Sequence, residues 1–140
     1  MRFPTYHGVP QCTAENFESD FAGRHTLHHV VAWWAGRKPN DPAIISYDRR
    51  QTVDWSTLDR VSTGLALDLI RLGFRKGDFL AAALPMSLEH IFLEYACFKI
   101  GVIHTPLDLR LRTAEALRCL GMPEPRGFAY LIPDLASAAR

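Results

Sequence analysis

The residues that could bind a ligand lie directly after a short apolar stretch in the second half of the chain. The stretch covers residues 102–105, Pro106 ends it, and Asp108, Leu109 and Arg110 follow. Open α/β sheets bind ligands beyond the carboxyl ends of their strands, which is where these three residues would lie. A guanidinium matches the geometry of a phosphate. Arg110 is therefore either a phosphate contact or a structural residue that pairs within its own subdomain.

Several histidines invite a metal or acid–base interpretation. His25, His28 and His29 have no cysteine beside them and no carboxylate at ligand spacing, so we interpret them as a group on a helix surface. His104 ends an apolar stretch and is expected to be a hydrogen-bonded core or edge histidine rather than a general base. The sequence therefore predicts no metal site.

A strand, helix and strand unit over residues 77–111 must position the charged turn. Residues 79–84 form an apolar run, typical of a strand that is buried on both faces. Ser87 can cap the following helix, Gly101 can end it, and residues 102–105 form a second strand. Such a unit is a right-handed crossover between parallel strands.

The segments on either side continue the alternation of helices and strands. The chain before the crossover unit predicts a helix that Thr26 caps and that ends near 37–38, a hairpin from 43–48 and 51–55, and a helix opened by Asp54 or Ser56 with an apolar stripe at Leu58, Val61, Leu65, Leu69 and Leu72. The chain after the unit predicts a helix at about 113–120, a buried strand at 128–132 and the start of a helix at 136–140.

This order predicts an α/β fold, namely a partial doubly wound, mainly parallel sheet with flanking helices and an N-terminal β-hairpin. Residues 1–25 contain prolines, glycines and scattered aromatic residues, so they predict an irregular N-terminal arm. Residues 26–140 predict one N-terminal α/β subdomain that is truncated at its C-terminal end, because the alternation breaks off inside an unfinished helix.

Composition limits the partners and the compartment. The chain has 140 residues, enough for one domain with a core, and its formal net charge of +1 gives no reason to expect nucleic acid as a partner. No apolar run approaches the roughly 18 residues of a membrane span, so no transmembrane segment is expected. Cys12, Cys97 and Cys119 are widely separated, which indicates reduced thiols in a cytoplasmic protein.

Three short segments carry a family resemblance. They read Val-Asp-Trp-Ser-Thr-Leu-Asp at 53–59, Gly-Phe-Arg-Lys-Gly-Asp at 73–78 followed by Leu-Pro-Met-Ser-Leu-Glu at 84–89, and Cys-Phe-Lys-Ile-Gly-Val-Ile-His-Thr-Pro-Leu-Asp-Leu-Arg-Leu at 97–111. In order and spacing they resemble the N-terminal part of adenylate-forming (AMP-binding) enzymes, the superfamily of acyl-CoA synthetases, firefly luciferase and peptide-synthetase adenylation domains. Departures such as Met86 for Asn and Leu109 for Pro blur the subfamily.

The resemblance implies a two-step reaction in the full-length enzyme. A carboxylate attacks the α-phosphate of ATP to give an acyl-adenylate and pyrophosphate, Mg²⁺ neutralises the phosphates, and the thiol of CoA displaces AMP. The family's phosphate loop, ribose-binding Asp and catalytic Lys lie downstream of residue 140. We therefore expect this chain alone to be inactive and to bind none of ATP, Mg²⁺ and CoA tightly.

The resemblance also suggests coenzyme contacts. In acetyl-CoA-forming relatives, the turn that matches Asp108, Leu109 and Arg110 lies near the nucleotide end of CoA, and an arginine near the position of Arg140 helps to hold its phosphate. These four residues are the candidate CoA contacts. The alternative is that Arg110 pairs within the subdomain and that Arg140 is only solvated.

Three functions follow from these observations. The first is the N-terminal part of an ATP-dependent, AMP-forming carboxylate–CoA ligase that acts on a small-molecule carboxylate. The second keeps the superfamily and changes the acceptor, as in amino-acid adenylation or an acyl-AMP ligase. The third is a stand-alone, non-catalytic interaction module. If the remainder of a ligase packs on this subdomain, the isolated chain should expose an apolar surface or self-associate through it.

Overall fold

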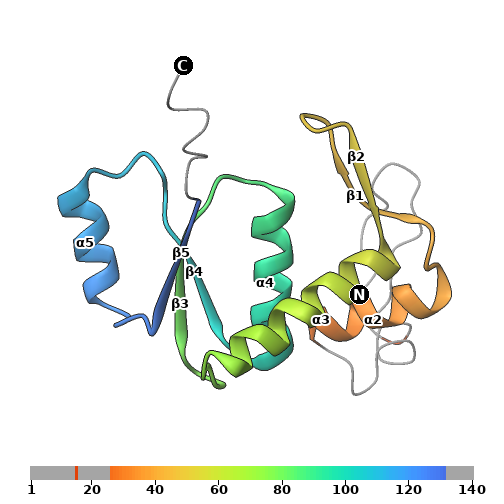
Figure 1. Cartoon of the computed structure of the whole chain (residues 1–140), viewed down its shortest axis with the longest axis horizontal. Coiled ribbons are helices and arrows are strands. Elements are labelled where there is room, and N and C mark those ends of the chain that lie inside the picture. The colour runs from red at the N-terminus through yellow and green to blue at the C-terminus, as the bar shows by residue number, and fades with distance from the viewer. Residues whose placement is uncertain (1–14, 16–25, 132–140) are drawn as a thin grey trace.

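The computed structural model describes residue 15 and residues 26–131. Its elements are α2 Leu27–Arg37, β1 Pro42–Ser46, β2 Gln51–Asp54, α3 Trp55–Arg71, β3 Phe79–Ala83, α4 Leu88–Ile100, β4 Ile103–Pro106, α5 Thr113–Gly121 and β5 Gly127–Tyr130 (Figure 1). The expected arm apart from residue 15, the expected helix at 136–140, Cys12, His25 and Arg140 lie outside the described residues.

The strands form two separate sheets. Strands β1 and β2 pair antiparallel as the expected hairpin, and β4, β3 and β5 form a parallel sheet with β3 in the centre. Helices α4 and α5 lie on opposite sides of the parallel sheet (Figure 1). The prediction of a partial doubly wound α/β fold with an N-terminal hairpin is therefore confirmed.

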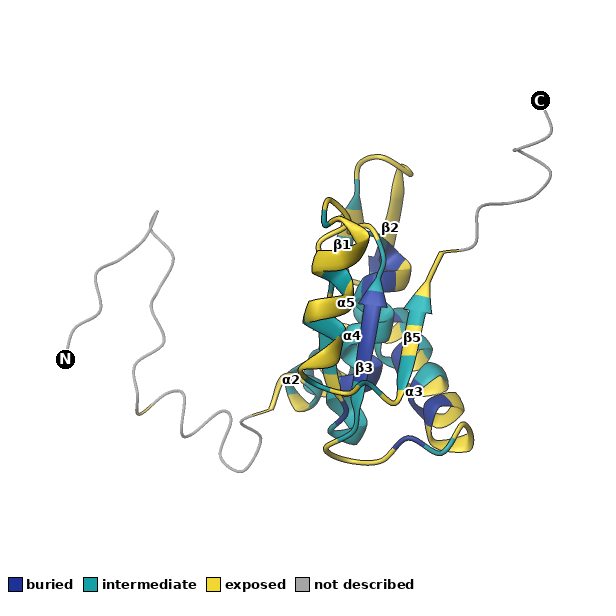
Figure 2. Ribbon diagram, turned by 90° about the vertical axis from the view of Figure 1, so that its left-hand side faces the viewer, coloured by how far each residue is buried: buried dark blue, intermediate teal, exposed yellow. Residues whose placement is uncertain are grey.

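The crossover unit from β3 to β4 also forms as expected. The Ser87 hydroxyl accepts a hydrogen bond from the His90 backbone N–H at 3.3 Å, and Gly101 ends α4 with a φ of 71°. This left-handed conformation favours glycine. Leu80, Ala81 and Ala82 of β3 are all buried, so the central strand is covered on both faces (Figure 2).

Helix α3 supplies the surface on which α4 packs. The Asp54 carboxylate accepts a hydrogen bond from the Thr57 backbone N–H at 2.7 Å, which caps the helix. Leu58 and Leu69 of the expected stripe are buried, whereas Leu72 lies beyond the end of the helix and is 72% exposed. The stripe prediction is therefore wrong at its last position, because the helix stops at Arg71.

The core consists of two clusters, and both contain residues of α3 and α4. One cluster joins α3 and α4 to the parallel sheet and consists of Ala66, Leu69, Phe74, Leu80, Ala96, Cys97 and Val102. The other joins them to α2 and the hairpin and consists of Val31, Val53, Leu58 and Leu88. Within the described part of the chain, none of the helices has both the length and the apolar character needed to cross a membrane.

Strand β5 differs from the sequence prediction of a second buried strand. Phe128 is 45% exposed and Tyr130 is 60% exposed, and their rings stack on each other at 5.7 Å. Among the described strands, β5 pairs only with β3, so it is an edge strand. An apolar run does not reveal how many neighbours a strand has, and β5 has one among the strands of residues 26–131.

Candidate functional site

The predicted ligand-binding turn lies directly after β4, at the carboxyl end of the parallel sheet. Within this turn, Arg110 Nη2 donates to Asp108 Oδ2 at 2.7 Å and Arg110 Nε donates to Asp108 Oδ1 at 3.0 Å. The Arg110 backbone N–H also donates to Asp108 Oδ1 at 2.9 Å. The structure thus brings Asp108 and Arg110 together, while Arg140 lies outside the described residues.

The ion pair fixes the charge states of this turn. The Arg110 side chain, followed by the Arg110 backbone N–H, lowers the pKa of Asp108 to about 2, and Asp108 in turn raises the pKa of Arg110. Asp108 is therefore an anion at neutral pH and cannot serve as a general base of ordinary strength. The Arg110 side chain is 90% exposed. Its hydrogen bonds to Asp108 use Nε and Nη2 and leave Nη1 out.

A buried histidine pair lies between α4 and β4. The His90 and His104 rings are 5.1 Å apart, and His104 Nδ1 is 3.9 Å from Glu94 Oε1. His104 Nε2 is buried without a hydrogen-bond partner among the described residues. The expectation of a fully hydrogen-bonded His104 is therefore wrong. Burial, followed by the charge of His90, lowers the pKa of His104, and Glu94 opposes this shift.

His28 and His29 lie in the first turn of α2, next to Thr26. Thr26 Oγ1 lies 2.7 Å from His29 Nδ1 and makes no capping hydrogen bond to the helix, so the cap predicted for Thr26 does not form. The His28 and His29 rings contact each other at 4.3 Å. Across residue 15 and residues 26–131, His, Cys, Asp and Glu side chains form no group of three or more that could hold a metal ion.

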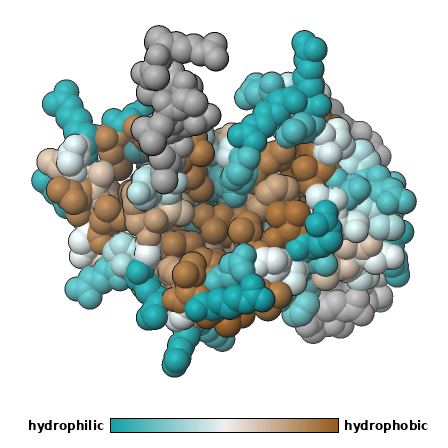
Figure 3. All heavy atoms as spheres, viewed as in Figure 1, coloured by the Kyte–Doolittle hydropathy of each residue, from teal (hydrophilic) through white to brown (hydrophobic). Residues whose placement is uncertain are grey.

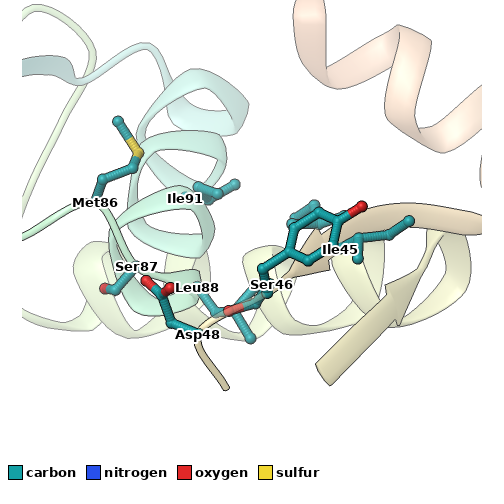
Figure 4. Close-up of a pocket in the computed structure, with 9 residues that line it drawn as sticks. Ile45, Ser46, Asp48, Met86, Ser87, Leu88 and Ile91 are labelled. Carbon is teal, nitrogen blue, oxygen red and sulfur yellow. The ribbon is translucent and has the colours of Figure 1, made fainter. Parts of the chain in front are cut away.

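Two surface hollows were not anticipated from the sequence. The hairpin hollow has a volume of about 280 Å³ and lies between β1 and the start of α4, with Ile45 and Ser46 on the side of the hairpin and Met86, Ser87 and Ile91 on the side of α4 (Figure 4). An ion pair between Arg49 and Glu89 also connects the hairpin to α4. No sequence signal marks this hollow, because its two walls lie about 40 residues apart in the chain.

The second hollow, which we call the β5 hollow, has a volume of about 590 Å³. Its lining is apolar apart from Glu89 and consists of Val61, Leu65, Leu84, Glu89, Phe92, Leu93, Phe128, Ala129, Tyr130 and Leu131. Figure 3 shows hydrophobic residues gathered across the middle of this face of the molecule. Neither hollow includes Asp108, Leu109 or Arg110 in its lining.

A doubly wound parallel sheet with a charged turn at its carboxyl edge defines a class of ligand-binding α/β folds. The family is established by comparison, because the model of the AMP-binding enzyme family matches residues 31–129. The chain belongs to this family of adenylate-forming enzymes.

The similar proteins fall into two groups. The chain is 35% identical over 101 residues to nonribosomal peptide synthetase 8 of Aspergillus fumigatus and 34% identical over 85 residues to acetyl-coenzyme A synthetase 1 of Candida albicans. Among solved structures, it is similar to a protein of Rhodopseudomonas palustris that carries the name long-chain-fatty-acid CoA ligase, with a TM-score of 0.71 and 27% identity.

The matched region is a small part of these proteins. It covers 71% of this chain but 1% of the peptide synthetase, and 58% of this chain but 13% of the acetyl-coenzyme A synthetase. The Rhodopseudomonas match covers 75% of this chain and 26% of the solved chain. The similarity therefore concerns the N-terminal part of the superfamily fold, as the sequence motifs predicted.

Proposed function

We propose that this chain is the N-terminal part of an ATP-dependent, AMP-forming carboxylate–CoA ligase. The observation that carries the proposal is the position and charge of the Asp108–Arg110 turn. It lies at the carboxyl end of β4, inside the region that matches the family, and it presents an arginine side chain that is 90% exposed. The similarity to acetyl-coenzyme A synthetases supports CoA as the acceptor.

Each residue of the turn has a distinct part in this proposal. Arg110 contacts a phosphate of CoA through Nη1, while Asp108 holds Nε and Nη2 and so fixes the plane of the guanidinium. Leu109 is 56% exposed and offers an apolar contact beside the charge. Arg140 is proposed as a second phosphate contact on the basis of its sequence position alone.

ATP, Mg²⁺ and the carboxylate belong to the full-length enzyme in this proposal. Mg²⁺ would supply charge neutralisation of the triphosphate, but the described residues do not fit a metal site, because no group of three suitable side chains forms among them. No reaction step can be assigned to these residues. We therefore propose that the chain alone is inactive, and pyrophosphate release by the purified chain with ATP and a panel of carboxylates would overturn this part.

The coenzyme contact can be tested on the purified chain by NMR titration with CoA. We expect weak binding that shifts the Arg110 amide and Nε resonances, and we expect Arg110→Ala to abolish the response. Arg118→Ala, on the exposed last turn of α5, is the matched control because it removes the same charge from a neighbouring element. An equal loss in both variants would indicate attraction by net charge alone and would contradict a specific contact.

A second candidate is amino-acid adenylation for a carrier protein. The observation that favours it is the 35% identity to a nonribosomal peptide synthetase over 101 residues, which is as high as the identity to the acetyl-coenzyme A synthetase. The two candidates share the adenylation step and differ in the thiol acceptor. A turn that ignores CoA but responds to a phosphopantetheine-bearing carrier protein would favour this second candidate.

A further inference from the structure

The histidine pair between α4 and β4 contains a buried ring nitrogen that lacks a partner. His90 belongs to α4 and His104 belongs to β4. The His104 side chain is 2% exposed, and its Nε2 atom has no hydrogen-bond partner among the described residues. A buried polar atom that is left unpaired destabilises a fold. A ligand that pairs with Nε2 would therefore stabilise this part of the chain.

The surroundings of the two rings determine which nitrogen carries the proton. His90 Nδ1 lies 3.2 Å from the backbone carbonyl oxygen of Pro85, which can only accept, so a neutral His90 carries its proton on Nδ1. His104 Nδ1 lies 3.9 Å from Glu94 Oε1, and this carboxylate oxygen also favours a proton on Nδ1. In both neutral rings, Nε2 therefore carries a lone pair rather than a hydrogen.

The distance between the rings suits two imidazoles that share one cation. The ring centres are 5.1 Å apart and the ring planes are inclined at 71°. A zinc ion binds imidazole nitrogens at about 2.0–2.1 Å in a tetrahedral arrangement, which places the centres of two such rings roughly 5 Å apart. A histidine that binds a metal usually donates its other N–H to a carboxylate or a backbone carbonyl. Glu94 and Pro85 are in the positions of these two partners.

We propose that the Nε2 atoms of His90 and His104 bind one divalent transition-metal ion, of which Zn²⁺ is the representative, and that this ion joins α4 to β4. Imidazole nitrogens suit Zn²⁺, Cu²⁺ and Ni²⁺, whereas Mg²⁺ prefers oxygen ligands. The site is therefore distinct from the Mg²⁺ of the proposed reaction. The inference goes beyond the proposed function and does not depend on it.

The site has two protein ligands and takes its remaining ligands from water. Across the described residues, no group of three suitable side chains forms, so a closed site with four protein ligands is not available. The Glu94 side chain is 41% exposed, so the pair has a solvent-accessible neighbour. Burial, followed by the charge of His90, lowers the pKa of His104, which favours the neutral imidazole that a metal requires.

A bound water molecule is the competing occupant. Water could donate one hydrogen to each Nε2 atom and so satisfy the same two lone pairs. Water would leave the stability of the chain independent of added metal, whereas the proposed site makes it depend on the concentration of the ion. A metal titration therefore distinguishes the two occupants.

The proposal can be tested on the full chain by NMR, after treatment with a chelator and at pH 7. We expect one equivalent of Zn²⁺ to shift the Nε2 resonances of His90 and His104, while both Nδ1 atoms stay protonated. We also expect saturating Zn²⁺ to raise the Tm by about 5 °C. Mg²⁺ at the same concentrations should change neither the resonances nor the Tm, because the ligands are nitrogen atoms.

A pair of variants separates this site from the other histidines. His90→Asn removes Nε2 but keeps an amide N–H that can reach the Pro85 carbonyl, and it should weaken Zn²⁺ binding at least about tenfold. His29→Asn removes an exposed imidazole from α2 and is the matched control, so it should leave the affinity unchanged. The resonances of the wild-type chain test the same contact even if His90→Asn does not fold.

Three results would overturn the proposal. Zn²⁺ that shifts only His28 and His29 would bind the surface of α2 instead. An equal loss of affinity in the two variants would contradict a site at His90. Unchanged Nε2 resonances and an unchanged Tm at millimolar Zn²⁺ would leave water as the occupant. The CoA titration monitors Arg110 rather than these histidines, so failure of one proposal can be told apart from failure of the other.

Discussion

Two neighbouring parts of the same sheet differ sharply in how they are packed. The first unit is β3–α4–β4, in which Leu80, Ala81, Ala96 and Cys97 are buried. The second unit is α5–β5, in which α5 has no buried residue and β5 exposes both of its aromatic side chains. Both units come from short apolar runs next to a helix with a capped start. Their burial therefore depends on what lies beside them rather than on their own residues.

The difference shows how a sheet distributes its stability. A central strand gains apolar contacts from both faces and both neighbours, whereas an edge strand lacks one of these neighbours. Side chains in the first unit should therefore contribute most of the folding free energy of the parallel sheet. Side chains on the outer face of β5 should contribute little in the isolated chain.

The largest expected contrast is between a side chain of β3 and one of β5. Leu80→Ala leaves a cavity among Phe74, Leu69 and Cys97 and should lower the free energy of unfolding by about 3 kcal/mol. Tyr130→Ala removes a side chain that is 60% exposed and should change it by less than about 0.5 kcal/mol. Urea denaturation followed by circular dichroism would measure both values. Equal losses would break the comparison between the two units.

Gly127, on the inner face of β5, is one position of the second unit at which a substitution should be as costly as in the first unit. A Cβ added at Gly127 would lie 2.7 Å from Phe74 Cζ and 3.5 Å from Leu80 Cδ1, which is too close for the phenyl ring to remain in place. We expect Gly127→Ala to destabilise the chain by about 2 kcal/mol. Gly64→Ala is the control, because nothing lies within 4 Å of that position in α3, and it should stabilise the chain by about 0.5–1 kcal/mol.

A smaller contrast separates the two helices. Lys99 of α4 donates to Asp59 Oδ1 of α3 at 2.6 Å, and the Lys99 side chain is mostly buried. Lys99→Ala should cost about 1 kcal/mol because it leaves a partly buried carboxylate without its partner. Arg118→Ala on α5 should have no measurable effect on the denaturation midpoint. If the two variants behave alike, α4 is not held more firmly than α5 by its charged residues.

Much of the first unit could be predicted from the sequence because its signals are local. Pro85 and Ser87 mark the end of a strand and the start of a helix, and Gly101 marks the end of that helix. The motifs that spread over residues 53–111 identified the family, since their order and spacing depend on many positions at once. The pairing of Arg110 with Asp108 agrees with one of the two alternatives that the sequence left open for Arg110.

The features that sequence reasoning missed all depend on contacts between distant residues. The apolar wall of the β5 hollow joins Leu65 to Phe92 and Tyr130, and no periodicity within one element reveals such a surface. The same holds for the contact between His90 and His104, which lie on a helix and on the next strand. The exposure of β5 was missed because its apolar run resembles that of β3, while only the number of neighbouring strands distinguishes them.

The smallest expected effect is a pH dependence of the free energy of unfolding that comes from His104, a buried histidine of the first unit. The pKa of His104 is lowered from 6.5 by burial and by His90, with Glu94 acting in the opposite direction. His104 therefore takes up a proton at a higher pH in the unfolded chain than in the folded chain. The contribution of His104 to stability is present above its unfolded pKa and is lost as the pH falls below about 6.5.

We expect the free energy of unfolding to decrease from pH 7 to pH 5 and this decrease to be smaller in His104→Tyr. His28 has a pKa that is lowered in the same direction, so His28→Gln is the control that shows its separate share. Denaturation curves at several pH values would provide the comparison. His104→Tyr removes the imidazole that takes up a proton on unfolding. If the free energy of unfolding has the same pH dependence in the wild type and in this variant, the buried histidine pair does not add to the pH sensitivity of the first unit.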